Sequence, residues 1–122
     1  MNPPVYETLK AVPAVTALIG SGDNCRAYPF GFAPQGVQIP YVTWTLVSGQ
    51  PTNRLTGLSA ADNLRVQVDC WGATGKAALQ VAEAVRTALE AVSHCVSVNL
   101  SERDEETRTF RHSMDFEFID LR

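Results

Sequence analysis

Two hydrophobic periodicities follow each other within residues 63–92, and they predict the centre of the fold. In the first part apolar and polar residues alternate, which is the period of a strand with one buried face. The apolar positions are Leu64, Val66, Val68 and Cys70, and the positions between them are Arg65, Gln67, Asp69 and Trp71. Gly72 and Ala73 interrupt the alternation, and the hydroxyl of Thr74 can cap a following helix.

The second part has the spacing of one apolar helical face. Its apolar positions are Ala78, Val81, Ala82, Val85, Leu89 and Val92. A helix of about eighteen residues is roughly 27 Å long, and a strand of about nine residues spans roughly 30 Å. Because the two lengths match, the helix can lie along the sheet and cover most of one face.

The remaining pattern predicts further helices and strands around this centre. Pro13 divides an N-terminal apolar stripe into two short helices, at residues 3–12 and 14–19. A weak strand is expected at 24–28, and strong strands at 41–47, 95–100 and 110–118. Residues 29–40 and 48–62 are expected to be loops or arms, because prolines and glycines are frequent in them. The predicted fold class is α+β: a mainly antiparallel sheet of four to five strands with helices packed on one face.

Composition and charge narrow the protein class. A chain of 122 residues with 45% hydrophobic and 19% charged residues is typical of one globular domain, here taken as residues 1–122. The formal charge of −3 gives no electrostatic reason to bind DNA or an anionic membrane. No apolar run is long enough to span a bilayer, and the N-terminus does not resemble a signal peptide. The three cysteines form no CxxC pair and are expected to be reduced thiols, with Cys70 a small hydrophobe on a buried face.

Catalytic and metal-binding patterns are absent from the sequence. There is no glycine-rich phosphate loop, no GxSxG, no HExxH and no metal-spaced Cys/His cluster. His112 lies among apolar residues and is expected to be a core or interface histidine, and His94 to be favoured as a cation at a helix end. Cys95 follows His94, but neighbouring strand residues point to opposite faces, so the two are not expected to form a nucleophile pair. We therefore predict no catalytic residue, no cofactor and no metal site.

One face of the predicted sheet is polar. It collects these side chains: Arg65, Gln67, Asp69, Arg111, Ser113, Asp115 and Glu117. The arginines offer Asp115 and Glu117 a simple role as salt-bridge partners. The face is compatible with plain solvent exposure, with a polar interface, or with the wall of a wet lumen in a ring.

Three segments are candidates for contacts with other chains. The first carries apolar side chains on a predicted loop, which either fold back on the core or meet another chain: Phe30, Phe32, Val37 and Ile39. The second is the long connection, where Arg54, Leu55 and Leu58 favour a projecting arm. The third is a charged stretch that is expected to be a solvated hairpin tip: Glu102, Arg103, Asp104, Glu105 and Glu106.

The order of these motifs resembles a known family. "LKAVPAVTALIG" is followed by "RAYPFGFAPQG", "IPYVTWTLVSGQP", "LRVQVDCWGATGKAALQVAEAVRTAL" and a closing "FRHSMDFEFID". Together they are similar to the tail completion, or tail terminator, proteins of long-tailed bacteriophages and prophages. The resemblance covers nearly the whole chain and is strongest at "RVQVDCWGAT" and the helix after it.

The resemblance implies a structural role in the virion. Members of the family are small α+β ring proteins, typically hexameric, that cap the finished tail tube, stop its polymerisation and present a surface to the head connector. The implied partners are further copies of the chain, the tail tube protein and the head completion or connector protein. DNA would pass through the ring without sequence-specific binding, no membrane is involved, and assembly would take place in the cytoplasm of the bacterial host. The resemblance implies no catalytic residue.

Other functions compete with this one. The chain could be a different adaptor of the same head–tail junction. From other classes, it could be a small cytosolic enzyme that uses Cys95, His94 or His112, or a ligand-binding domain with a site beneath the long connection. The lack of a catalytic pattern, together with apolar segments on predicted arms, favours a protein that works by binding.

Overall fold

The chain is represented by a computed structural model that describes residues 4–29, 37–51, 61–98, 102–104 and 109–121. The helices are α1 (Val5–Lys10), α2 (Pro13–Ile19), the 3-10 helix η1 (Gly22–Asn24) and α3 (Gly75–Leu89). The strands are β1 (Ala27–Pro29), β2 (Tyr41–Pro51), β3 (Ala61–Gly72), β4 (His94–Val98), β5 (Glu102–Asp104) and β6 (Thr109–Leu121).

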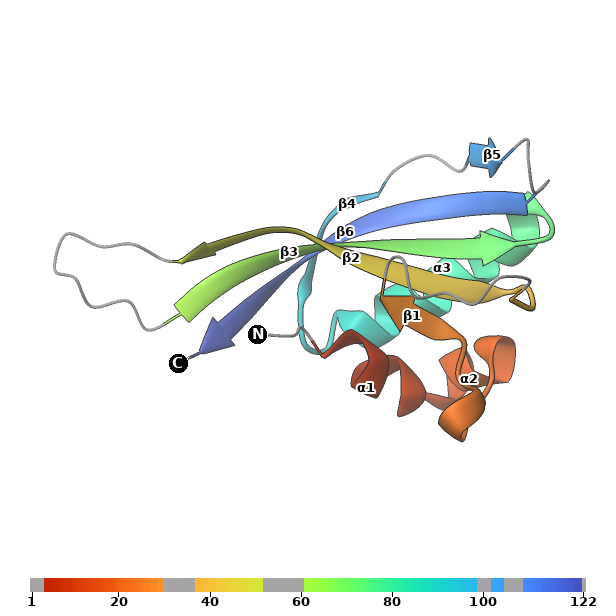
Figure 1. Cartoon of the computed structure of the whole chain (residues 1–122), viewed down its shortest axis with the longest axis horizontal. Coiled ribbons are helices and arrows are strands. Elements are labelled where there is room, and N and C mark those ends of the chain that lie inside the picture. The colour runs from red at the N-terminus through yellow and green to blue at the C-terminus, as the bar shows by residue number, and fades with distance from the viewer. Residues whose placement is uncertain (1–3, 30–36, 52–60, 99–101, 105–108, 122) are drawn as a thin grey trace, which may run out of the picture.

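The strands form one mainly antiparallel sheet in the order β1-β2-β3-β6-β4, and β5 also pairs with β6. Only the pairing of β1 with β2 is parallel among the described strands. The three α-helices lie together on one side of this sheet, and β5 extends its edge next to β6 (Figure 1). The predicted α+β class, with helices on one face, is therefore confirmed.

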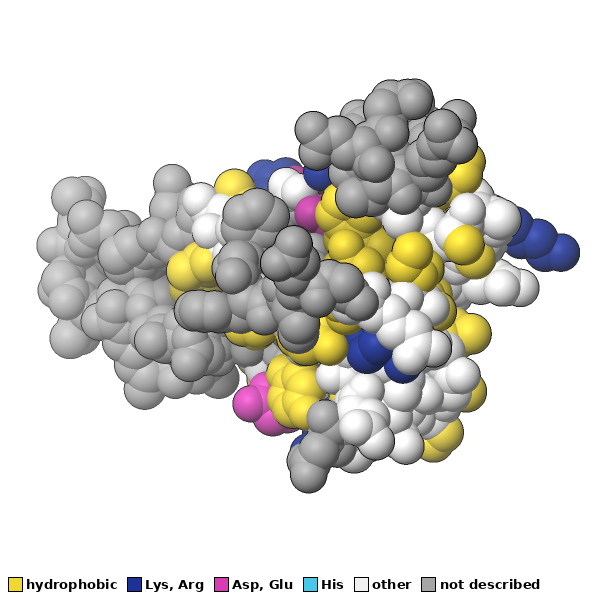
Figure 2. Space-filling view, turned by 45° about the vertical axis from the view of Figure 1, so that its right-hand side comes forward, with side chains coloured by type: hydrophobic (Ala, Val, Ile, Leu, Met, Phe, Trp, Pro, Cys, Tyr) yellow, Lys and Arg dark blue, Asp and Glu magenta, His cyan; other side chains and the backbone are white. Residues whose placement is uncertain are grey.

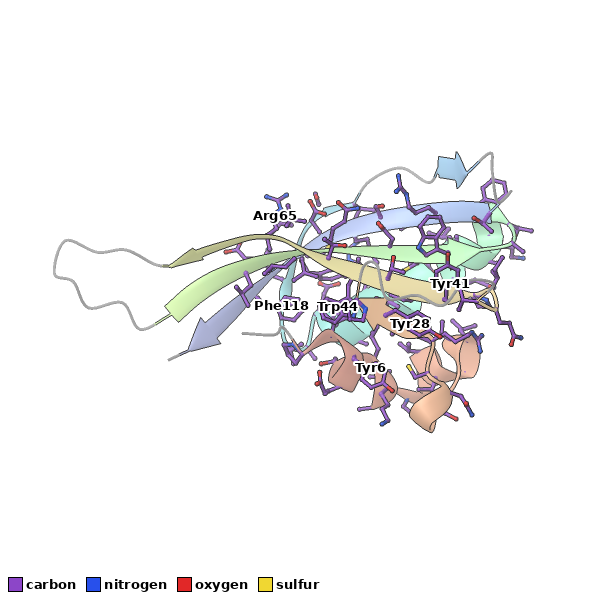
Figure 3. All side chains as sticks on the ribbon, viewed as in Figure 1. Tyr6, Tyr28, Tyr41, Trp44, Arg65 and Phe118 are labelled. Carbon is purple, nitrogen blue, oxygen red and sulfur yellow. The ribbon has the colours of Figure 1, made fainter. Side chains whose placement is uncertain are left out.

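Strand register explains which side chains enter the core. Because facing residues of antiparallel strands share one side of a sheet, each apolar position of β3 meets an apolar or core-facing position of β6. The facing pairs are Leu64–Phe118, Val66–Phe116, Val68–Met114 and Cys70–His112. All eight side chains are buried, and Val66, Val68, Cys70 and Phe116 are completely inaccessible to solvent. In Figure 3, Trp44 and Phe118 lie on the helix side of the sheet and Arg65 on the opposite side.

Helix α3 is positioned by its N-terminal cap and by a glycine at the end of β3. The backbone N–H of Ala77 donates to the Thr74 hydroxyl at 3.0 Å, which confirms the predicted cap. A Cβ at Gly72 would lie 2.6 Å from the backbone nitrogen of Ala78, so this close approach of strand to helix requires glycine. The helix ends at Leu89, earlier than predicted, and Val92 is 47% exposed in the turn that follows. Assigning Val92 to the buried face was therefore wrong.

Pro13 separates α1 from α2 as predicted, because it occupies the first position of the second helix. Arg26 joins this N-terminal region to the start of β2. Its guanidinium donates to the backbone carbonyl oxygens of Pro40 at 2.8 Å and of Leu18 at 3.2 Å. Because Arg26 also pairs through its backbone with Val42, one residue connects α2, β1 and β2.

The structure corrects three predicted boundaries. Strand β2 continues through Ser48 to Pro51 and pairs there with β3, which begins at Ala61, so the predicted long connection is shorter by these residues. The weak strand expected at 24–28 is displaced to β1, because Gly22–Asn24 forms a 3-10 turn. Residues 102–104, predicted as a hairpin tip, form β5 against Thr109–Arg111. The strand expected at 95–100 is present as β4 from His94 to Val98, and residues 99–100 lie outside the described residues.

Three strand ends project beyond the helical layer. In Figure 1 the last part of β2, the first part of β3 and the end of β6 extend together past the helices. Register places Pro51 opposite Asp62, and Asp62 opposite Asp120. The sequence predicted a projecting arm within residues 48–62, and the described ends of β2, β3 and β6 form the three-stranded base of a projection there.

Candidate assembly surfaces

The sheet face opposite the helices carries an ordered polar network. Asp69 is buried to 5% exposure and accepts hydrogen bonds from Ser113 and from the Gln67 amide, the latter at 3.1 Å. The indole N–H of Trp71 donates to the Thr43 hydroxyl at 3.1 Å. These bonds satisfy polar groups that would otherwise be costly to bury, so they fix the middle of this face in one arrangement.

Aromatic and charged groups extend this network toward both ends of β3. Tyr41 stacks on Trp71 with ring centroids 5.7 Å apart, and the Arg111 guanidinium lies 5.7 Å from the Trp71 ring. At the other end Arg65 pairs with Asp115 at 3.0 Å, which confirms one of the predicted salt bridges. Because the Arg65 side chain is 46% exposed, this pair stabilises the fold only weakly. The predicted polar face is therefore present, and hydrogen bonds and an ion pair join several of its side chains to one another.

The three cysteine thiols lie in environments that are typical of packing residues. Burial, together with the charge of Asp69, raises the pKa of the Cys70 thiol, so this cysteine stays protonated and cannot act as a thiolate. Burial also raises the pKa of Cys25. The Cys95 thiol donates to the carbonyl oxygen of Ser97 at 3.6 Å. Among the residues that the structure describes, no group of three or more His, Cys, Asp or Glu side chains could hold a metal ion.

His112 lies on the helix side of the sheet, as predicted for a core or interface histidine. It is 9% exposed. Burial lowers its pKa, and the negative charge of Glu83 on α3 acts in the opposite direction. The imidazole is therefore favoured in its neutral form at pH 7.

A groove lies between α3 and β4, next to His112. It has a volume of about 180 Å³ and is lined by Leu79, Ala82, Glu83, Arg86, Val98, His112 and Met114. Ala82 and Met114 are buried and form an apolar floor of the groove. Glu83 and Arg86 are exposed, so charged side chains line its solvent-facing rim. The hydrophobic pattern of the sequence did not predict this groove. The feature of the sequence that could have indicated the groove is Leu79, an apolar residue outside the buried stripe of the helix.

The residues predicted for partner contacts are only partly described. Val37 and Ile39 are half-buried, and Glu102, Arg103 and Asp104 form β5 through their backbones. Phe30, Phe32, Arg54, Leu55, Leu58, Glu105 and Glu106 lie outside the described residues. Figure 2 shows hydrophobic side chains exposed in several places on the face turned to the viewer, with basic side chains among them. The predicted contact residues therefore remain predictions.

The fold defines a small α+β protein, and comparison with known families assigns the chain to one of them. The model of the family described as tail completion protein gp17 matches residues 3–119. The chain therefore belongs to this family and is a structural protein of a phage-type tail. None of the helices in the described part of the chain is long and apolar enough to cross a membrane.

A solved structure shares the fold. A chain from a structure titled "Virion of native gene transfer agent (GTA) particle" matches with a TM-score of 0.69 and 20% sequence identity. The match covers 97% of this chain and 92% of that chain. A search of curated proteins found no match.

Proposed function

We propose that the chain forms a ring at the head-proximal end of the tail, where it ends polymerisation of the tail tube and joins the tail to the head connector. The observation that carries this proposal is membership of the tail completion family over residues 3–119. The ring is expected to be a hexamer of identical chains, with the tube protein on one side and the head completion protein on the other. The role is architectural and involves no catalysis.

The surroundings of the buried thiol and imidazole groups support a role without turnover. Cys70 is held as a protonated thiol, and His112 contributes to the packing of β6 against α3. A ring of identical subunits needs two unlike surfaces on each copy, because each interface is heterologous. The sheet has two different outer edges, β1 with β2 on one side and β4 with β5 on the other.

The projecting strand ends and the apolar segments supply further contact sites. We expect the Phe30–Ile39 segment and the Arg54–Asp62 segment to contact tube, connector or neighbouring subunits, and the charged stretch at Glu102–Glu106 to face solvent, lumen or a partner. The net charge of −3 suits a channel that DNA crosses without adhering, since like charges repel.

Deleting the gene from its phage or prophage tests this role. Electron microscopy of the resulting lysate should show filled heads separated from tails, with tails of uncontrolled length, and expression of the wild-type chain in trans should restore joined particles. Detached tails of normal length would indicate instead an adaptor of the junction that does not control tube polymerisation. Normal joined particles in the deletion strain would refute both roles.

Chemical cross-linking distinguishes the two structural roles further. A terminator should cross-link to the tail tube protein, whereas an adaptor on the head side should cross-link to head proteins alone. Both kinds of cross-link, to the tail tube protein and to head proteins, are sought in joined particles that contain the wild-type chain.

A further inference from the structure

We propose that the groove between α3 and β4 binds a lysine side chain of another protein of the particle. The lysine stem would lie on the apolar floor of the groove, and its ammonium group would pair with the carboxylate of Glu83. This inference rests on the proposed function, because it requires a chain that works through contacts with other proteins of the tail or the head connector.

Four of the residues that line the groove lie along one face of α3. They are Leu79, Ala82, Glu83 and Arg86, and their spacing of three or four residues is that of neighbours on a helix surface. The first two are apolar and the last two are charged, so the groove has an apolar end and a charged end. Four residues of helix separate Leu79 from Glu83, which is a rise of about 6 Å. A side chain with a short apolar stem and a charged tip therefore matches this row.

The apolar part of the groove suits a methylene chain. Ala82 and Met114 are buried beneath it, and Leu79 and Val98 beside it are 42% and 47% exposed. The groove volume of about 180 Å³ is close to that of an apolar cavity of about 150 Å³ that binds benzene. Lysine covers apolar surface with its four-carbon stem while its charged group stays hydrated. The open, charged end of the groove allows that arrangement.

The unpaired charge at the groove is negative. Nε of Arg86 donates to the carboxylate of Glu90 at 2.9 Å, so the positive charge of this lining residue has a partner. Within the described part of the chain, Glu83 forms no ion pair, although its side chain is exposed at the same rim. The two carboxylates and the one guanidinium together have a net charge of −1. Charge complementarity therefore favours a cationic occupant over an anionic one.

His112 lines the groove and is neutral there. Burial lowers the pKa of its imidazole, and the negative charge of Glu83 opposes this shift. The charged groups that line the groove with it are Glu83 and Arg86 of α3. On β3 the facing residue is Cys70, whose thiol is uncharged because burial raises its pKa. The neutral imidazole does not repel an ammonium group at pH 7, whereas the imidazolium formed in acid would.

The chain's own copies are poorly placed to supply this lysine. The sequence has two lysines, Lys10 and Lys76. The ammonium nitrogen of Lys10 lies 5.5 Å from the centre of the Tyr6 ring. Lys76 precedes Leu79 by three residues on α3 and lies on the surface that contains the groove, so its insertion into another copy would bring two like surfaces together. Such a contact is isologous and does not build a ring. The occupant is therefore a lysine of a different protein.

Methyl-group NMR of the purified full-length chain tests the chemistry of the groove. Nα-acetyl-lysine methylamide should shift the methyl signals of Leu79, Val98 and Met114 saturably, with a dissociation constant in the millimolar range that is typical of so few contacting atoms. The matched probe Nα-acetyl-norleucine methylamide has the same stem without the ammonium group and should bind at least about fivefold more weakly. Hexanoate has the opposite charge and should bind no better than the norleucine probe. Equal binding of the lysine and norleucine probes, or tighter binding of hexanoate, would overturn the inference.

Two substitutions and a change of pH test the named groups. Glu83→Gln should weaken binding of the lysine probe about fivefold, and Glu7→Gln, the same change at an exposed position of α1, should leave it unchanged. Binding should also weaken between about pH 7.5 and about pH 5, because protonated His112 repels the ammonium group, and His112→Gln should reduce this pH dependence. Undiminished binding by Glu83→Gln would refute the pairing. Circular dichroism checks the fold of each variant, and if Glu83→Gln does not fold, the three probes on the wild type decide.

Zero-length cross-linking identifies the occupant in joined particles. A carbodiimide joins a carboxylate to a lysine amine in contact with it, forming an amide while the carbodiimide takes up the water that is lost. Mass spectrometry should find Glu83 linked to a lysine of another virion protein in wild-type particles. That product should be absent from particles with Glu83→Gln and present in those with Glu7→Gln. A link from Glu83 only to Lys10 or Lys76 of another copy, or no link at Glu83 while other carboxylates of the chain react, would refute the proposed occupant.

Failure of this inference and failure of the proposed function give different results. If deletion of the gene separates heads from tails, but the groove binds no lysine probe and forms no cross-link, the inference is refuted and the proposed function stands. If the deletion strain yields normal joined particles, the proposed function is refuted, and the inference falls with it because no virion partner is then required.

Discussion

Truncation of Phe116 to alanine probes the packing on which the whole arrangement depends. Phe116 is completely buried at the centre of β6, opposite Val66 and Cys95, and is the bulkiest of the fully buried side chains. Removing a buried phenylalanine side chain typically costs about 3–5 kcal/mol, because apolar contacts are lost and a cavity remains. Domains of this size are stable by only about 5–15 kcal/mol. The variant should therefore lose a large part of its free energy of unfolding.

Urea denaturation followed by circular dichroism measures this loss. With an m-value of about 2 kcal/mol/M, a loss of about 4 kcal/mol lowers the midpoint by about 2 M. Val47→Ala is the control: its side chain is 53% exposed, so its effect should stay within about 0.5 kcal/mol. A loss below about 1 kcal/mol for Phe116→Ala, at an unchanged m-value, would refute the assignment of the core to the face between sheet and helices.

Three further substitutions test individual contacts. Arg26→Ala should lower the free energy of unfolding by about 1.5–3 kcal/mol in the same assay, because the carbonyl oxygen of Pro40 loses a charged donor at 2.8 Å; full stability would contradict this role. Thr74→Ala should cost about 1 kcal/mol, because the Ala77 N–H loses its acceptor, and Thr74→Ser should restore most of it. Burial lowers the pKa of His112 in the folded state, so its stabilising contribution is present above the unfolded pKa of about 6.5 and is lost as the pH falls toward the folded value. His112→Gln should therefore lose less stability than the wild type between pH 7.5 and pH 5, and equal pH profiles would contradict the burial of a neutral imidazole.

Local sequence patterns predicted the centre of the fold well. The alternation in β3 and the helical spacing in α3 depend on one buried face each, and that face is visible in the order of apolar residues. The Thr74 cap and the break at Pro13 are likewise local, because a single side chain determines each. The predicted polar face followed from the same alternation, and the Arg65–Asp115 pair confirmed part of it.

Features that depend on the neighbouring strand were not predictable in this way. The continuation of β2 to Pro51 contains Gly49, which disfavours a strand, and it is the pairing with β3 that extends it. The charged residues of β5 indicated a solvated tip, yet their backbones pair with β6. The bulges at Val47 and Val96, where the pairings of β2 with β3 and of β4 with β6 shift, are differences in register between two strands, so a single strand's pattern cannot reveal them. The groove was not predicted either, because it is formed only when α3 packs beside β4 in the folded chain.

The most direct test of the central claim, that the chain is an architectural ring of the tail, is cryo-electron microscopy of the assembled particle. The account predicts that density fitting this fold repeats around the tail axis between the tube and the head connector. Density for the chain elsewhere in the particle, or its absence from purified particles, would contradict the account.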